Sequence, residues 1–157
     1  GVMAQPIWSD MASSFAMRDS RRICIVHRKY LALAVIASVG TIVIGLFINP
    51  VLAIWLGSQA PALSLVESAS LVFLVAVTVL TNSETCLGNA TNRLGPQVVG
   101  YCLGAIAKYP LSVGLSIIIP GWASVVLANG FVLIPVLVSQ HIANRWLTAN
   151  GEEDSVV

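Results

Sequence analysis

The stretch Tyr30–Val51, with the sequence YLALAVIASVGTIVIGLFINPV, decides the fold of this chain. It carries no charge, and a helix or strand formed by it would be apolar on every face. A transmembrane helix needs about 20 mostly apolar residues, whereas a membrane β-strand alternates apolar and polar residues over about 10 positions. Because lipid offers backbone groups no hydrogen-bonding partner, only helices and closed barrels cross a membrane. The stretch therefore predicts a membrane-spanning α-helix.

The composition of the whole chain agrees with this interpretation. Of its 157 residues, 57% are hydrophobic and 10% are charged, and the mean hydropathy is +0.87. Soluble domains carry about a quarter charged residues, so these values exclude an ordinary soluble domain. The net charge of +1 provides no field that would attract nucleic acid.

Three further segments have the length and composition of membrane helices. We expect an all-α, polytopic membrane protein whose transmembrane region, residues 30–144, holds four helices at about 30–51, 62–82, 95–119 and 122–142. Residues 82–93 are polar and predict a loop. Residues 145–157 predict a polar cytoplasmic tail.

Residues 1–29 differ in character from the spans. Apolar side chains recur at helical spacing between Ile7 and Phe15, and a cluster of cations follows. This pattern fits an interfacial helix held by anionic lipid. It also fits the inner end of a preceding helix that leads into a basic cytoplasmic linker. We expect the second arrangement, with the chain a segment cut from a longer protein.

The orientation follows from the basic residues. Of the eight Lys and Arg residues, all except Lys108 fall before the first span, between the second and third, or after the fourth. Cytoplasmic loops carry the excess of Lys and Arg. Both ends of the four-helix region are therefore expected in the cytoplasm.

Lys108 and Glu67 are the charges inside the predicted spans. With a rise of about 1.5 Å per residue, Lys108 lies roughly 20 Å from the cytoplasmic side, and Glu67 lies about 7–8 Å from the outer side. Their similar depths suggest an ion pair between adjacent helices. Glu67 could instead extend outward to the interface. We expect Lys108 to face an aqueous cavity that holds an anionic ligand, because an intramembrane cation is costly elsewhere.

Other residues within the spans bear on helix shape and packing. Pro110 and Pro135 each predict a bend, because proline lacks an amide donor. Gly100 and Gly104 form a GxxxG pair that permits close helix approach inside a bundle. Asn129 is a further polar candidate for a substrate cavity, although an interhelical hydrogen bond is the better explanation of this residue.

The sequence shows no constellation for catalysis, a metal or a cofactor. The three cysteines lie far apart and have no metal-ligand spacing. His27 and His141 lie near the inner ends of the predicted helices and match no pattern for metal or nucleophilic chemistry. We therefore expect a protein that is not an enzyme.

The order of several motifs resembles the C-terminal part of the polysaccharide and O-antigen flippases. These belong to the superfamily of multidrug, oligosaccharidyl-lipid and polysaccharide exporters. The residues that carry this resemblance are Trp8 and Asp19 before the first span, Trp55 and Gly57 after it, and Asn89, Arg93 and Gln97 at the start of the third. The segment Pro110-Leu111-Ser112 is similar to the middle of that helix in the family, whereas Lys108 stands where a small amide is common.

The resemblance implies a fold and a function. The four spans would be helices nine to twelve of a twelve-helix, MATE-like transporter in the bacterial inner membrane, and would form part of its C-terminal lobe. The partners would be the remaining N-terminal helices and a polyprenyl-diphosphate-linked oligosaccharide, which the transporter flips across the membrane for polysaccharide biosynthesis. A multidrug extruder of the same superfamily, a small self-contained four-helix transporter and a membrane scaffold remain alternatives.

Overall fold

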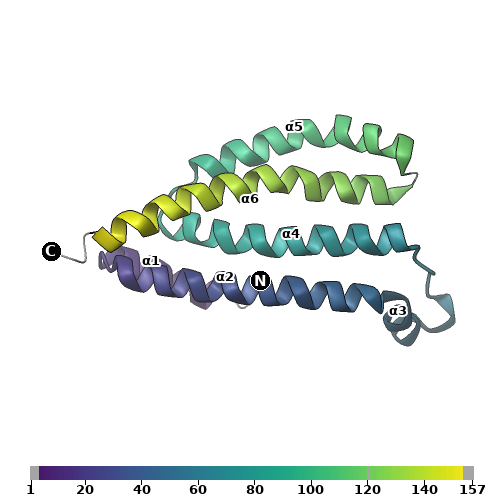
Figure 1. Ribbon diagram of the computed structural model, residues 1–157, viewed down its shortest axis with the longest axis horizontal. Helices are drawn as coiled ribbons and strands as arrows, with labels where there is room; N and C mark the ends of the chain where they lie inside the picture. The colour runs from purple at the N-terminus through teal and green to yellow at the C-terminus, as the bar shows by residue number, and fades with distance from the viewer. Residues whose placement is uncertain (1–3, 120, 154–157) are drawn as a thin grey trace.

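The computed structural model describes residues 4–119 and 121–153 and shows an all-α protein (Figure 1). The described elements are α1 (Ala4–Ala16), α2 (Ser20–Leu46), α3 (Ile48–Leu56), the short 3-10 helix η1 (Gly57–Gln59), α4 (Leu65–Ala90), α5 (Gly95–Ile118) and α6 (Trp122–Glu153). Within these residues, α2, α4, α5 and the part of α6 from Trp122 to Arg145 are long and apolar enough to cross a membrane. The expectation of an all-α chain with four such helices is confirmed.

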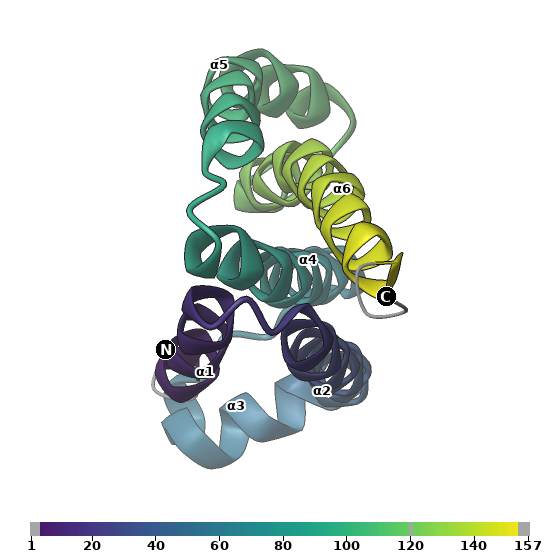
Figure 2. The same ribbon diagram turned by 90° about the vertical axis from the view of Figure 1, so that its left-hand side faces the viewer.

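The long helices form a row. Figures 1 and 2 show α5, α6, α4 and α2 lying side by side in that order, with α1 against α2 and α4. The helix α6 packs against both α4 and α5 and lies between them. The start of α2, the α4–α5 connection and the end of α6 gather at one end of the row, and α3 lies at the other end (Figure 1).

The first long helix begins ten residues earlier than predicted. Asp19 accepts a hydrogen bond from the backbone N–H of Arg22 at 2.9 Å and thereby caps the start of α2. An aspartate at this position satisfies an amide that has no partner within the helix. The helix ends at Leu46 rather than near Val51, and Phe47 separates it from α3. Gly57 follows α3 with a φ of +63°, a conformation that favours glycine.

The helices α4 and α6 continue beyond their predicted ends. The helix α4 runs to Ala90, so most of the predicted loop 82–93 is helical, and α6 runs to Glu153 through much of the predicted tail. Residues 154–157 lie outside the described residues. The length of an apolar segment reflects only the thickness of the hydrocarbon that the helix crosses. The helix itself continues beyond the apolar segment when its polar side chains find partners.

The helix α1 packs onto the start of α2 and the end of α4. Met11 is fully buried and forms a small core with Cys86, Leu87 and Ala90 of α4. An ion pair of 2.7 Å between Arg22 Nη2 and Asp10 Oδ1 joins α1 to α2. The helix α1 and the start of α2 therefore form a helical hairpin over residues 4–29, where the sequence predicted the end of one helix and a linker.

The helix α5 contacts the rest of the described chain mainly through two glycines. Gly100 and Gly104 are its buried residues, and both face α6. A Cβ atom on Gly100 would lie 3.2 Å from the Cα of Val136, and one on Gly104 would lie 3.2 Å from the carbonyl oxygen of Val132. The GxxxG pair thus lets α5 and α6 approach closely, while the other faces of α5 stay exposed.

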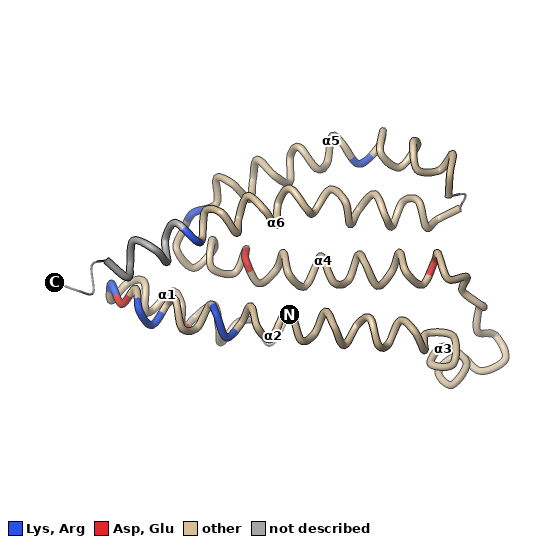
Figure 3. Tube along the Cα trace, in the orientation of Figure 1, with Lys and Arg blue, Asp and Glu red and all other residues tan. Residues whose placement is uncertain are grey.

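The charges are distributed unevenly along the row. Figure 3 shows Lys and Arg gathered at the end that holds the α4–α5 connection, apart from the one cation within α5. This distribution agrees with the orientation predicted from the loops, in which that end faces the cytoplasm.

Cysteine labelling tests this orientation. In a variant whose native cysteines are replaced by serine, we expect an impermeant maleimide added outside intact cells to label Ser58→Cys in η1. The same reagent should leave Asn92→Cys in the α4–α5 connection unlabelled until the cells are opened. Labelling of Asn92→Cys in intact cells, with Ser58→Cys protected, would reverse the orientation.

Candidate functional site

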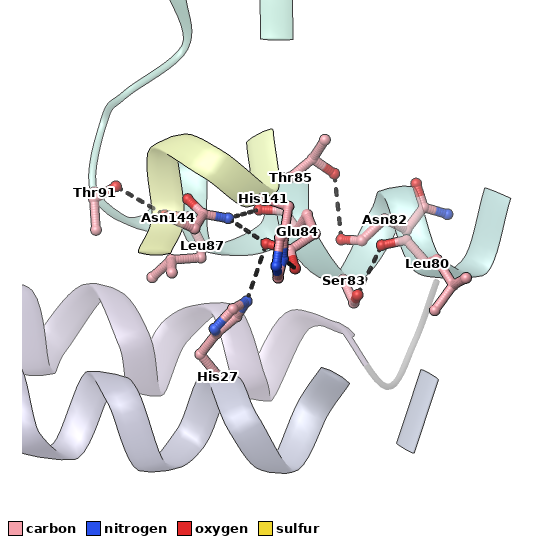
Figure 4. A network of polar contacts seen from close by, with 10 residues as sticks. All are labelled: His27, Leu80, Asn82, Ser83, Glu84, Thr85, Leu87, Thr91, His141 and Asn144. Carbon is pink, nitrogen blue, oxygen red and sulfur yellow. Dashed lines mark hydrogen bonds and ion pairs between the residues drawn. The ribbon is translucent and has the colours of Figure 1, made fainter. Parts of the chain in front are cut away.

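A buried carboxylate lies in α4, close to the end of the row where the cations gather. The Glu84 side chain is 1% exposed. Its neighbours Ser83 and Thr85 satisfy their hydroxyl groups within α4, because Ser83 donates to the carbonyl of Leu80 at 2.7 Å and Thr85 to that of Asn82 at 3.2 Å (Figure 4). The carboxylate therefore receives its partners from other helices.

Three side chains from α2 and α6 surround the Glu84 carboxylate (Figure 4). His141 Nδ1 lies 2.8 Å from Oε1, and His27 Nε2 lies 3.3 Å from Oε2. Asn144 Nδ2 donates to Oε2 at 2.6 Å and to the backbone carbonyl of Glu84 at 3.0 Å. We call His27, Glu84, His141 and Asn144 the carboxylate cluster. It joins α2, α4 and α6 at a single point.

The two imidazoles of the cluster differ in exposure. The side chain of His141 is 45% exposed, whereas that of His27 is 7% exposed. His27 Nε2 is buried and has no hydrogen-bond partner, although it lies next to the carboxylate. A carboxylate between one accessible and one enclosed imidazole can accept, hold and pass on protons.

A second buried polar group, Gln140 of α6, packs against Gly88, which lies one turn along α4 from Glu84. Gln140 is 1% exposed, and its Nε2 has no hydrogen-bond partner. A Cβ atom on Gly88 would lie 2.8 Å from Gln140 Oε1, so the glycine leaves room for the amide. Gln97, one of the residues that carry the family resemblance, also has a buried oxygen, Oε1, without a partner. Together with the carboxylate cluster, these two amides place several buried polar groups at the end of the row that holds the α4–α5 connection.

The structure brings two of the sequence-predicted cavity residues together. Lys108 of α5 and Asn129 of α6 line one groove, of about 320 Å³, with Leu74 of α4. A second groove, of about 520 Å³, runs between α5 and the start of α6, and Lys108 lines it as well. The lysine is exposed, and Asn129 is half-buried.

The predicted ion pair between Glu67 and Lys108 is absent from the described part of the chain. Glu67 lies in the first turn of α4, where its Oε2 accepts hydrogen bonds from the N–H and hydroxyl of Ser64, both at 2.8 Å. Its own N–H donates to Ser64 Oγ at 3.3 Å, which completes a capping box. Since α6 lies between α4 and α5, equal depth does not bring the two charges together. Glu67 therefore caps the start of α4.

The remaining candidates are spread along the chain. Pro110 lies within α5 and Pro135 within α6. Trp8 and Asn89 line an open pocket between α1, α2 and α4, together with Tyr30 and Asn82. Asp19 caps α2, Trp55 and Gly57 lie at the end of α3, and Arg93 precedes α5.

No family model, curated protein or solved structure matches this chain. Among the described residues, no group of three or more His, Cys, Asp and Glu is arranged to hold a metal ion. Assignment of a function therefore depends on the grooves beside Lys108 and on the carboxylate cluster.

Proposed function

We propose that this chain is part of a membrane transporter that flips a polyprenyl-diphosphate-linked oligosaccharide across the bacterial inner membrane, and that it forms part of the C-terminal lobe of a MATE-like fold. The observation that carries the proposal is the exposed position of Lys108 in the middle of α5. A lysine in contact with hydrocarbon costs several kcal/mol, so such residues face water-filled cavities or partner groups.

Polar side chains continue along the face of α5 that holds this lysine. Ser112 and Ser116 follow at intervals of four residues, and both line the same groove as Lys108. Residues four apart lie on one side of a helix. Ser124 contributes a further hydroxyl from α6. This face supports an aqueous pathway in which the ammonium group attracts an anion, such as the diphosphate of the cargo.

The shape of the helix also supports a cavity here. Pro110 lies two residues beyond Lys108 and cannot donate the helical hydrogen bond to the carbonyl of Ile106. Irregular backbone inside a membrane is tolerated where it lines a cavity or is buried in protein. The exposed faces of α5 leave room for the further helices that a two-lobed transporter would supply.

Removing the charge tests this function. We expect Lys108→Ala to reduce flipping of the lipid-linked oligosaccharide in proteoliposomes by about 10–100-fold, because a hydrogen bond to a charged group contributes about 1.5–3 kcal/mol. Lys108→Arg keeps the charge and should retain most of the activity. Lys29→Ala removes an exposed cation from the cytoplasmic end of α2 and should have no effect.

The transport assay separates the alternatives. Full activity of Lys108→Ala at normal expression would remove this residue from the pathway. Efflux of cationic drugs without movement of the lipid-linked sugar would favour a multidrug extruder. A protein that moves neither substrate, but whose deletion disturbs a membrane assembly, would favour a scaffold.

A further inference from the structure

We propose that His27, Glu84 and His141 form a binding site for one exchangeable proton, which the carboxylate shares with the two imidazoles and which holds α2 against α4 and α6. The site lies on helices other than α5, which carries Lys108, and it does not depend on the identity of the cargo. It therefore goes beyond the proposed transport function.

The charge of the buried site favours the binding of one proton. An ionised Glu84 with two neutral imidazoles has a net charge of −1, and a buried charge without compensation is costly. Among the described residues, the titratable side chains in contact with this carboxylate are His27 of α2 and His141 of α6. One added proton makes the trio neutral.

The helices around Glu84 leave the uptake of the compensating proton to the two histidines. The helix α1 packs against this part of α4 through the apolar side chain of Met11. The cations Arg28 and Arg145 follow His27 and Asn144 in the sequence, and each takes part in an interaction. Asn144 donates hydrogen bonds to the carboxylate but carries no charge.

The geometry at His27 also favours the binding of this proton. Its Nε2 is buried, lies 3.3 Å from Glu84 Oε2 and has no hydrogen-bond partner. In the neutral tautomer that carries its proton on Nδ1, His27 Nε2 and Glu84 Oε2 are both acceptors and repel one another. A proton on Nε2 converts the contact into a charge-assisted hydrogen bond, which is shorter and stronger than a neutral one. The pair thus has a place for one proton, and its binding draws α2 toward α4.

The exposure of the cluster defines the route of that proton. His141 is 45% exposed and accepts a proton from water at Nε2. It then donates its Nδ1 proton to Glu84 Oε1, 2.8 Å away. Rotation of the carboxyl group brings this proton to the enclosed His27 Nε2. The net change is the transfer of one proton from solvent to His27 and a change of tautomer at His141, whose N–H bond moves from Nδ1 to Nε2.

Nitrogen-15 NMR of labelled histidines in the full chain, reconstituted in lipid nanodiscs, tests the proposal over the range in which histidine changes charge, about pH 5–8. This sequence has two histidines, and the variants His27→Gln and His141→Gln assign their signals. We expect both imidazoles to respond to pH in one linked transition, as interacting groups do.

Glu84→Gln keeps a side chain of the same shape and removes the charge. We expect this variant to lose the linked transition, so that His141 titrates alone and His27 no longer takes up a proton in this range. Glu67→Gln changes the capping glutamate at the opposite end of the same helix and should leave the transition intact. Independent responses of the two histidines in the wild type, or an unchanged transition in Glu84→Gln, would overturn the proposal.

A second variant tests the site if Glu84→Gln fails to fold. His141→Gln preserves a hydrogen-bond donor to Glu84 but removes the exposed imidazole. We expect proton exchange at His27 to slow by about 100-fold, the lower end of what a positioned proton donor contributes. An unchanged exchange rate at His27 would contradict the route through His141.

Discussion

Truncation of Glu84 to alanine is expected to lower the free energy of unfolding by about 3 kcal/mol, because it leaves buried polar groups without partners. Asn144 Nδ2 loses its 2.6 Å hydrogen bond to the carboxylate and keeps the one to the backbone. His27 and His141 lose the group that lies between them. The cavity left by the missing atoms adds to the cost.

A glutamate on the same helix provides the matched control. Glu67→Ala removes one half of the capping box with Ser64 at an exposed helix end, which costs about 1 kcal/mol. Chemical unfolding of both variants in the same detergent compares the two losses. Equal losses would show that the carboxylate cluster contributes no more to stability than an exposed cap.

The four long helices could be predicted because apolar length is a local property. Each span is recognised from about 20 consecutive residues, and the third was placed within one residue of α5, at Gly95–Ile118. The ends of the others were less accurate because a helix does not have to stop where its apolar segment stops. At the end of α4, polar side chains such as Ser83 and Thr85 satisfy themselves within the helix, which continues to Ala90.

The carboxylate cluster could not be predicted from the sequence. Glu84 is separated by 57 residues from His141 in the sequence, and it stood in a predicted loop, where a charged side chain needs no partner. A usable signal was present, because His27, Glu84 and His141 all lie near the inner end of a predicted helix. That placement brings them to one depth, but only the packing of α2, α4 and α6 shows that they meet.

The prediction of an ion pair between Glu67 and Lys108 was wrong for the same physical reason. A depth along the membrane normal follows from the rise per residue, whereas the order of helices across the membrane depends on tertiary packing. Neighbours in the sequence are often neighbours in space, but here α6 separates α4 from α5. Lys108 therefore faces grooves and lies away from a carboxylate.

Insertion of a large side chain at Gly100 is expected to separate α5 from α6. Gly100→Leu places a Cβ 2.9 Å from Val136 Cγ2 and 3.2 Å from Val136 Cα, and the second contact is with backbone that cannot turn aside. Overpacking of this kind costs about 1–3 kcal/mol. Since the buried residues of α5 are Gly100 and Gly104, few other contacts oppose its release from the bundle.

Gly114 is the matched control for this change, because it lies on the same helix and a Cβ there meets nothing within 4 Å. Gly114→Leu should be neutral or should stabilise α5, since leucine favours a helix by up to about 1 kcal/mol relative to glycine. A disulfide between cysteines placed on α5 and α6 measures the separation: cross-linking should fall in Gly100→Leu and persist in Gly114→Leu. Equal cross-linking in both variants would mean that α5 is held by other surfaces, such as further helices of the proposed lobe, and that the GxxxG contact with α6 is not what positions Lys108.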